Sequence, residues 1–201
     1  MKNYDLTDED GTLLVQTARK IVTEYITKHS RLELDEKIKE RFSFDAGLFV
    51  TLSVSSDLRG CIGFPMPRKL NNALVDAAIA ASTEDPRFSP VTKEELDKIT
   101  FEVTILTPPV EIKVDDPSKL ASNIKVGRDG LIVRQGFYSG LLLPQVPVEY
   151  GWTEEEFLSH TCKKAGLASN CWMDKKTLVF SFEGIIFKEE TPKGKVIREK
   201  L

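Results

Sequence analysis

The sequence has few of the residues that serve as covalent or metal staples. It contains three cysteines and two histidines among 201 residues, and no Cys-x₂-Cys pair, so we expect neither a bound metal nor another cofactor. The odd number of cysteines, without the spacing of a disulfide framework, is typical of a reducing compartment. The phosphate-binding loop, the dinucleotide fingerprint, the Gly-x-Ser-x-Gly elbow and the His-Glu-x-x-His motif are all missing.

Charge and hydropathy exclude two further classes of partner. The chain has 28 Lys and Arg against 31 Asp and Glu, a formal net charge of −3, so nucleic acid is not an expected partner. The longest purely apolar runs have four or five residues, far short of the roughly 20 that a membrane span needs. The first ten residues are polar and acidic, unlike a signal peptide. We therefore expect a cytoplasmic protein with no membrane association.

What is present is a chain long enough to bury a core without staples, with 41% hydrophobic residues. Apolar residues at helical spacing predict helices over 7–29, 70–81 and 153–166. Alternating or β-branched runs predict strands over 49–54, 58–63, 99–105, 124–126, 131–133, 141–143 and 177–187. Because helices and strands mix without a regular βαβ alternation, the pattern predicts an α+β fold with mainly antiparallel pairing. The charged C-terminal tail is expected to be frayed.

The segment Leu58-Arg59-Gly60-Cys61-Ile62-Gly63 is the most unusual in the chain. Glycines on either side of a thiol let another group approach its backbone closely. In an extended strand Arg59 and Cys61 point to the same side, where the guanidinium would favour a nucleophilic thiolate. The alternative is a small buried cysteine, with Arg59 paired elsewhere. On the first interpretation Cys61 is a candidate catalytic residue, and Arg59, Gly60 and Gly63 contact the ligand.

This hexapeptide and several later blocks resemble the AMMECR family, named from a chromosomal region linked to Alport syndrome, mental retardation, midface hypoplasia and elliptocytosis. The later blocks are 84–90, 102–108, 140–146 with Glu149 and Trp152, and 162–167 with Trp172. The resemblance implies one family domain over 1–201 with two unequal subdomains, each a mainly antiparallel sheet with helices. It also implies that the larger subdomain holds both chain ends and that the shared segments line a cleft.

The resemblance implies no known reaction, because the family has no established activity. Roles in transcription, replication, repair or translation have been suggested for it, which would make it a regulatory factor. Members also occur beside, or fused to, Memo-like and radical S-adenosylmethionine proteins, which suggests a partner of that kind.

Five polar residues outside the hexapeptide are further candidates. Asp85 and Arg87 are both candidate ligand contacts. Arg87, held between prolines, could be an anion-binding fork, or it could form an ion pair with Asp85 that only ties down the loop. Glu102 is a candidate base or hydrogen-bond acceptor if its strand face lines a cleft, and a solvated side chain otherwise. Gln145 and Glu149, in a segment braced by prolines, could recognise a ligand or belong to a stiff connection.

The remaining cysteines suggest no chemistry. Cys162 lies on the apolar stripe of its predicted helix and is expected in the core, while Cys171 follows a turn and is expected to be partly exposed. Two functions follow from the whole sequence. The first is a small-ligand-binding protein or enzyme with a cleft around Cys61, and the sequence leaves open whether it catalyses a reaction. The second is a protein-binding regulatory module with a Memo-like or radical-enzyme partner.

Overall fold

The computed structural model describes residues 4–199, and the chain forms two compact units. The larger unit contains residues 4–106 and 185–199 of the described chain, and the smaller unit contains residues 107–184. Strand β7 (Leu178–Glu189) begins in the smaller unit and ends in the larger one. Among the described residues, none of the helices is long and apolar enough to cross a lipid bilayer.

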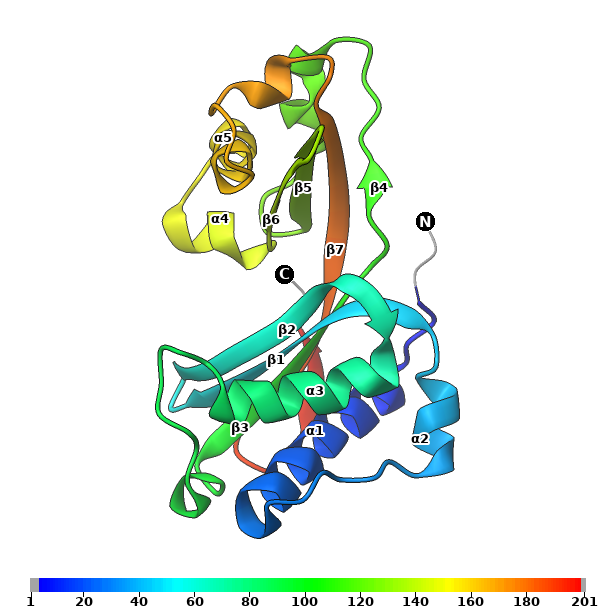
Figure 1. Cartoon of the computed structure of the whole chain (residues 1–201), viewed down its shortest axis with the longest axis vertical. Coiled ribbons are helices and arrows are strands. Elements are labelled where there is room, and N and C mark those ends of the chain that lie inside the picture. Colours follow the sequence, from blue (N-terminus) through cyan, green and yellow to red (C-terminus); the bar gives the residue numbers. More distant parts are fainter. Residues whose placement is uncertain (1–3, 200–201) are drawn as a thin grey trace. The chain divides into compact units, whose positions relative to one another are not determined.

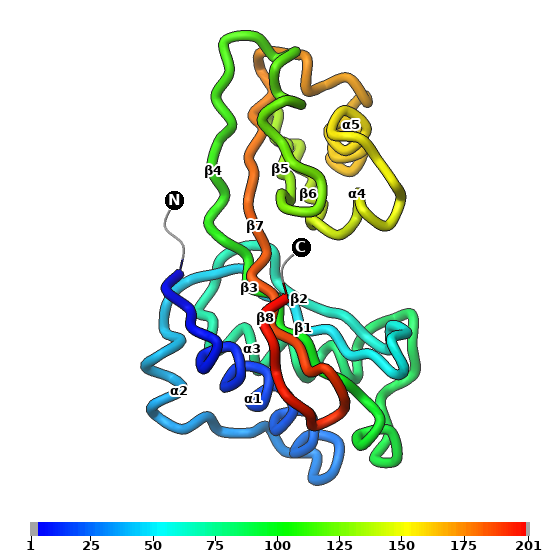
Figure 2. The backbone as a smooth tube through the Cα atoms, turned by 180° about the vertical axis from the view of Figure 1, so that it is seen from behind, coloured from blue at the N-terminus to red at the C-terminus, as the bar shows by residue number. Residues whose placement is uncertain are grey.

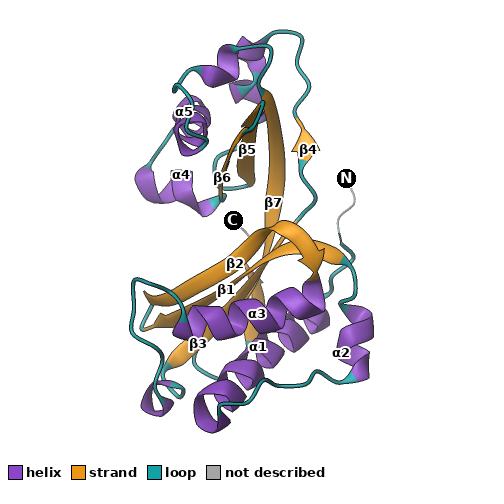
Figure 3. Cartoon of the chain, in the orientation of Figure 1, coloured by secondary structure: helices purple, strands orange, loops and turns teal. Residues whose placement is uncertain are grey.

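The larger unit is an antiparallel sheet with helices on one face (Figures 1 and 3). Its strands follow the order β2-β1-β3-β7, and β8 pairs with the last part of β7, as the red end of the tube in Figure 2 shows. Its elements are α1 (Asp8–Lys28), α2 (Glu36–Arg41), β1 (Asp45–Val54), β2 (Asp57–Lys69), α3 (Leu70–Thr83), the 3₁₀ turn η1 (Lys93–Glu95), β3 (Ile99–Leu106) and β8 (Val196–Glu199).

Alternation along the strands places the core of the larger unit between its sheet and α1 and α3. Leu48, Val50 and Leu52 of β1 are fully buried, whereas Phe49 and Thr51 between them are only partly buried. Successive residues of a strand point to opposite faces, so the first set packs against the helices and the second set forms the opposite face. A capping box begins α1, as predicted, with Thr7 and Asp10 bonding each other's backbone amides.

The smaller unit has its own core between a sheet and α5. Its elements are β4 (Val110–Glu111), η2 (Pro117–Lys119), η3 (Ala121–Asn123), β5 (Asp129–Gln135), β6 (Tyr138–Leu142), α4 (Gln145–Tyr150), α5 (Glu154–Lys164), η4 (Cys171–Met173) and the first part of β7. Strand β5 lies between β6 and β7, and every pair is antiparallel. Thr153 and Glu156 form the capping box that the sequence predicts at the start of α5.

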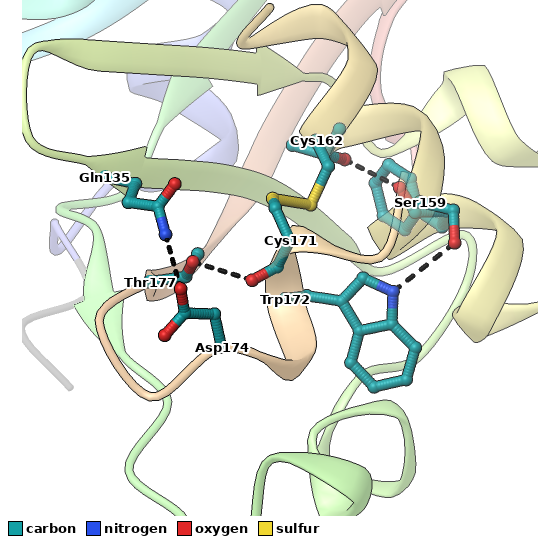
Figure 4. The surroundings of a disulfide bond; sticks show 9 residues. Gln135, Ser159, Cys162, Cys171, Trp172, Asp174 and Thr177 are labelled. Atoms are coloured by element: carbon teal, nitrogen blue, oxygen red, sulfur yellow. Dashed lines mark hydrogen bonds between the residues drawn. A yellow bond between two sulfur atoms is a disulfide. The ribbon is translucent and has the colours of Figure 1, made fainter. Parts of the chain in front are cut away.

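A disulfide between Cys162 and Cys171 joins the end of α5 to η4 (Figure 4). The sequence interpretation of unpaired cysteines is therefore wrong for this pair. Cys162 is buried in the core, as predicted. Cys171, which was expected to be partly exposed, is also buried, with 7% of its surface accessible. Nearby, the Trp172 indole N–H donates to Ser159 and the Thr177 hydroxyl donates to the Cys171 carbonyl. Side-chain hydrogen bonds therefore surround the cross-link. The two cysteines are nine positions apart in the sequence, and the turn after α5 brings them together.

Two local expectations were wrong, and one element was not predicted. Residues 124–126 follow a 3₁₀ turn and lead into a turn at Gly127, where φ is +84°, so they form no strand. Residues 145–150 form the short helix α4, which the sequence analysis did not predict. The C-terminal segment forms β8 because four of its residues pair with 186–189 of β7. The tertiary fold brings β7 beside the tail, and the charged sequence of the tail itself does not predict this pairing.

We predict that the disulfide stabilises the smaller unit by about 2 to 3 kcal/mol, because it closes a short loop in the unfolded chain. Reduction should lower the denaturant midpoint of the unfolding transition reported by Trp152 and Trp172 fluorescence. Cys61→Ser, which keeps the cross-link, should show the same sensitivity to reductant as the parent protein. An unchanged midpoint after thiol titration has confirmed full reduction would contradict this prediction.

Candidate functional site

Three side chains from three strands form one row across the sheet of the larger unit. Thr51 of β1 pairs with Cys61 of β2 on one side and with Glu102 of β3 on the other. Directly opposite residues in antiparallel strands project from the same face. The row therefore lies on the face opposite α1 and α3, where Phe49 and Thr51 are partly buried. The sheet thus brings together two of the predicted residues, Cys61 and Glu102.

Cys61 is a partly buried free thiol. The Thr51 hydroxyl donates to its Sγ at 3.4 Å. Burial raises the pKa of Cys61, and the thiolate-favouring effects of the Thr51 hydrogen bond and the Arg87 charge only oppose this rise. The thiol is consequently protonated at neutral pH, which argues against an activated nucleophile.

Arg59 does not activate the thiol, which corrects the first of the two sequence interpretations. Its guanidinium binds Glu95 through two hydrogen bonds of 2.7 and 3.1 Å. The β1–β2 register shifts between Leu52 and Ser53, so Arg59 is the extra residue of a β-bulge. Glu95 also accepts the Thr92 amide N–H at 2.8 Å. Arg59 therefore ties η1 to the sheet.

Asp85 and Arg87 cover the outer edge of β2 at Cys61. The buried Asp85 carboxylate accepts the Cys61 amide N–H at 2.8 Å and two guanidinium hydrogen bonds from Arg87 at 3.0 and 2.7 Å. Arg87 also donates to the Cys61 carbonyl at 3.5 Å. The pair thus supplies the donor and acceptor that a further strand would provide. This is the ion-pair alternative of the sequence analysis, and the Arg87 side chain is still 54% exposed.

The two glycines of the hexapeptide make room for neighbouring groups. A Cβ on Gly60 would lie 2.1 Å from the carbonyl oxygen of Ala81, so glycine is required for the close approach of α3 to β2. A Cβ on Gly63 would lie 2.4 Å from the ring of Phe49. Both glycines therefore have a packing role, and ligand contact by either remains a prediction.

Glu102 is a carboxyl group held in an unfavourable environment. Burial raises its pKa, the Glu199 charge raises it further, and the Thr104 hydroxyl and Lys188 oppose the rise. Thr104 donates to Glu102 at 3.3 Å, and Lys188 forms an ion pair with Glu199. The side chain is therefore only partly solvated, and among the described residues it forms no direct ion pair.

A hollow of about 440 Å³ opens beside Glu102 within the larger unit. It extends along the next row of the same face, where Ser53 pairs with Thr100. Residues from three segments line it: Ser53, Ser55, Ser56, Lys98, Thr100, Phe101, Glu102, Lys188, Glu189, Glu190, Thr191 and Pro192. This volume falls in the usual range for small-molecule sites.

The other two predicted residues, Gln145 and Glu149, belong to α4 of the smaller unit. The Oε1 atom of Gln145 is buried and has no hydrogen-bond partner among the described residues. Glu149 is exposed. The candidate site described here is therefore built from the larger unit alone.

The sequence analysis missed most of the polar residues on this face, including Thr51, Ser53, Thr100, Thr104 and Lys188. The alternation of β1 and β3 could have placed the hydroxyl residues on one face, but Lys188 comes from a distant strand. Within residues 4–199, no three His, Cys, Asp or Glu side chains gather as a metal site would require. The arrangement suits hydrogen bonding to a small polar molecule.

Comparison with known proteins identifies similar chains. The AMMECR1 family model matches residues 15–187. A protein of Thermococcus gammatolerans is 52% identical over 98% of this chain and 99% of its own, and one of Methanocaldococcus jannaschii is 50% identical over 98% of each. The crystal structure of an uncharacterised protein of Pyrococcus horikoshii matches with a TM-score of 0.87 at 47% identity, covering 98% of this chain and 100% of that one. Their names state no activity.

We predict that Cys61 reacts with iodoacetamide more slowly than free cysteine at neutral pH, because its raised pKa leaves less thiolate. The rate should increase as the pH rises above the ordinary thiol range. The two disulfide-bonded cysteines do not compete, so mass spectrometry of the native protein measures this site, and Cys61→Ser should take up no label. A rate at or above that of free cysteine would contradict the protonated thiol.

We predict that Asp85→Asn destabilises the protein by about 1.5 kcal/mol at neutral pH, because a charged acceptor is lost. Arg87 lowers the pKa of Asp85 well below its ordinary value. Its stabilisation is thus present above the unfolded-state pKa, about 4, and is lost as the pH falls toward the folded-state value. The difference in unfolding free energy between parent and variant should shrink as the pH is lowered from about 4. A difference independent of pH would show that the ion pair contributes nothing.

Proposed function

The chain belongs to the AMMECR1 family, and from this premise we propose that it is a small-molecule-binding protein whose site is the polar face around Cys61 and Glu102. One observation carries the proposal: Glu102, at one end of the row Cys61–Thr51–Glu102, lines a hollow of about 440 Å³ on the sheet face opposite α1 and α3. A pocket with a few convergent polar groups and a perturbed carboxyl is the general signature of a binding site.

The cost of Glu102 supports this proposal. A carboxyl with a raised pKa gives up stability at neutral pH, where it must ionise in a partly buried place. Groups that reduce stability are retained where they serve function. Neither Thr104 nor Lys188 compensates the burial in full, so a ligand that hydrogen-bonds the carboxyl would recover part of the cost.

The role that suits Cys61 is contact with the ligand. Its thiol is protonated, and its sulfur accepts a hydrogen bond from the Thr51 hydroxyl. The thiol can therefore donate a weak hydrogen bond to the ligand or pack against it. The edge clamp of Asp85 and Arg87 fixes its backbone. Such a preformed site loses little entropy when it binds.

The test compares the full chain with Glu102→Gln, Cys61→Ser and the control Glu40→Gln, an exposed position on α2. Each protein is screened against a library of cellular metabolites by thermal shift, and hits are measured by calorimetry. We expect at least one metabolite to bind the parent and the control equally, and to bind Glu102→Gln about tenfold more weakly. If every hit binds all four proteins equally, or none binds the parent, the proposal is wrong.

The same variants measure how much the Glu102 carboxyl lowers the free energy of unfolding. The folded-state pKa of Glu102 lies above its unfolded value, so the folded state binds more protons and stability is lost as the pH rises through the raised pKa. Without ligand, Glu102→Gln should therefore have a higher unfolding free energy than the parent at pH 7, and Glu40→Gln should not. A loss of stability in Glu102→Gln would contradict this account.

A further inference from the structure

We propose that the hollow beside Glu102 binds a neutral polyhydroxylated molecule of the size of a monosaccharide or cyclic polyol. This inference rests on the proposed function, and it adds the chemical class of the ligand. It follows from the kinds of group that line the hollow, from their balance of charge and from the conformation of the turn at its rim.

Hydroxyl groups are as frequent in the lining as charged groups. Five of the twelve lining residues carry one: Ser53, Ser55, Ser56, Thr100 and Thr191. A hydroxyl can donate and accept at the same time. A ligand that carries several hydroxyls of its own matches such a surface, whereas an apolar ligand would leave the lining groups unpaired at a cost.

The charges of the lining are close to balanced. Lys98 and Lys188 oppose Glu102, Glu189 and Glu190. Two of these five charges are already engaged, because Lys188 pairs with Glu199 and Glu189 pairs with Arg19. The other three, Lys98, Glu102 and Glu190, carry both signs. No strong field of one sign remains to select an ion, so a neutral ligand is favoured. Glu102 adds a carboxyl that can accept from a ligand hydroxyl, the bond that would recover its burial cost.

Two serines that line the hollow have a backbone conformation that glycine would adopt with less strain. Ser55 and Ser56 form the two-residue turn between β1 and β2, and both have positive φ, +51° and +71°. Turns of this kind favour glycine or asparagine, and other residues there are strained. Strain of this sort collects at functional sites. Retaining both side chains places two hydroxyls at the mouth of the hollow.

The experiment uses saturation-transfer NMR of the full chain with three probes: D-ribose, D-glucose and myo-inositol. We expect at least one probe to bind saturably, with an affinity that changes by less than about twofold when NaCl rises from about 0.05 to about 0.3 M, since a neutral ligand is not screened. Ser55→Gly/Ser56→Gly should keep or raise stability, because glycine relieves the positive φ. It should also weaken binding, and Glu102→Gln should weaken it about tenfold.

The control is Ser30→Ala, which removes an exposed hydroxyl remote in sequence from the lining residues and should leave binding unchanged. Three results would each overturn the polyol assignment. They are no saturable binding of any probe, binding by the Glu102 and turn variants as tight as by the parent protein, and a strong dependence of the affinity on salt. The proposed function fails separately. If the metabolite screen yields Glu102-dependent hits that are all charged or apolar, the binding site stands and only the ligand class assigned here is wrong.

Discussion

The antiparallel register of β2, β1 and β3 is the constraint on which the candidate site depends. Because Cys61, Thr51 and Glu102 are direct partners across two strand pairs, a shift by one residue in either pair would send one of them into the apolar core. The buried residues on the other face prevent such a shift. Leu48, Val50 and their neighbours on β3 must face α1 and α3, so hydrophobic packing on one side of the sheet sets the chemistry on the other.

Ion pairs cover the outer edge of β2, where no further strand pairs with it among the described residues. Asp85 and Arg87 engage both the amide and the carbonyl of Cys61, while Arg59 and Glu95 hold the following turn. The two arginines that looked like candidates for activating a thiol or gripping an anion thus have structural partners. Their bonds keep β2 from pairing with another chain, and they fix the backbone of Cys61 against the row.

The chemistry of the face follows from burial more than from nearby charge. Burial is the largest influence on both Cys61 and Glu102, and it raises the pKa of each. A protonated thiol and a carboxyl with a raised pKa, beside several hydroxyls, form a surface of hydrogen-bond donors and acceptors. Such a surface is better suited to recognising a polar molecule than to nucleophilic attack, for which a lowered thiol pKa would be needed.

The sequence by itself determined the α+β class, the helix starts at Thr7 and Thr153, and the alternation of the central strands, because these depend on neighbours within a few residues. It also predicted Cys61 and Glu102 as candidates, although nothing local showed that they share a row. Tertiary structure alone decided the Cys162–Cys171 cross-link, the strand β8 and the arrival of Lys188 beside Glu102. Those contacts join segments whose meeting depends on how the whole sheet and its turns fold, and no local periodicity encodes that.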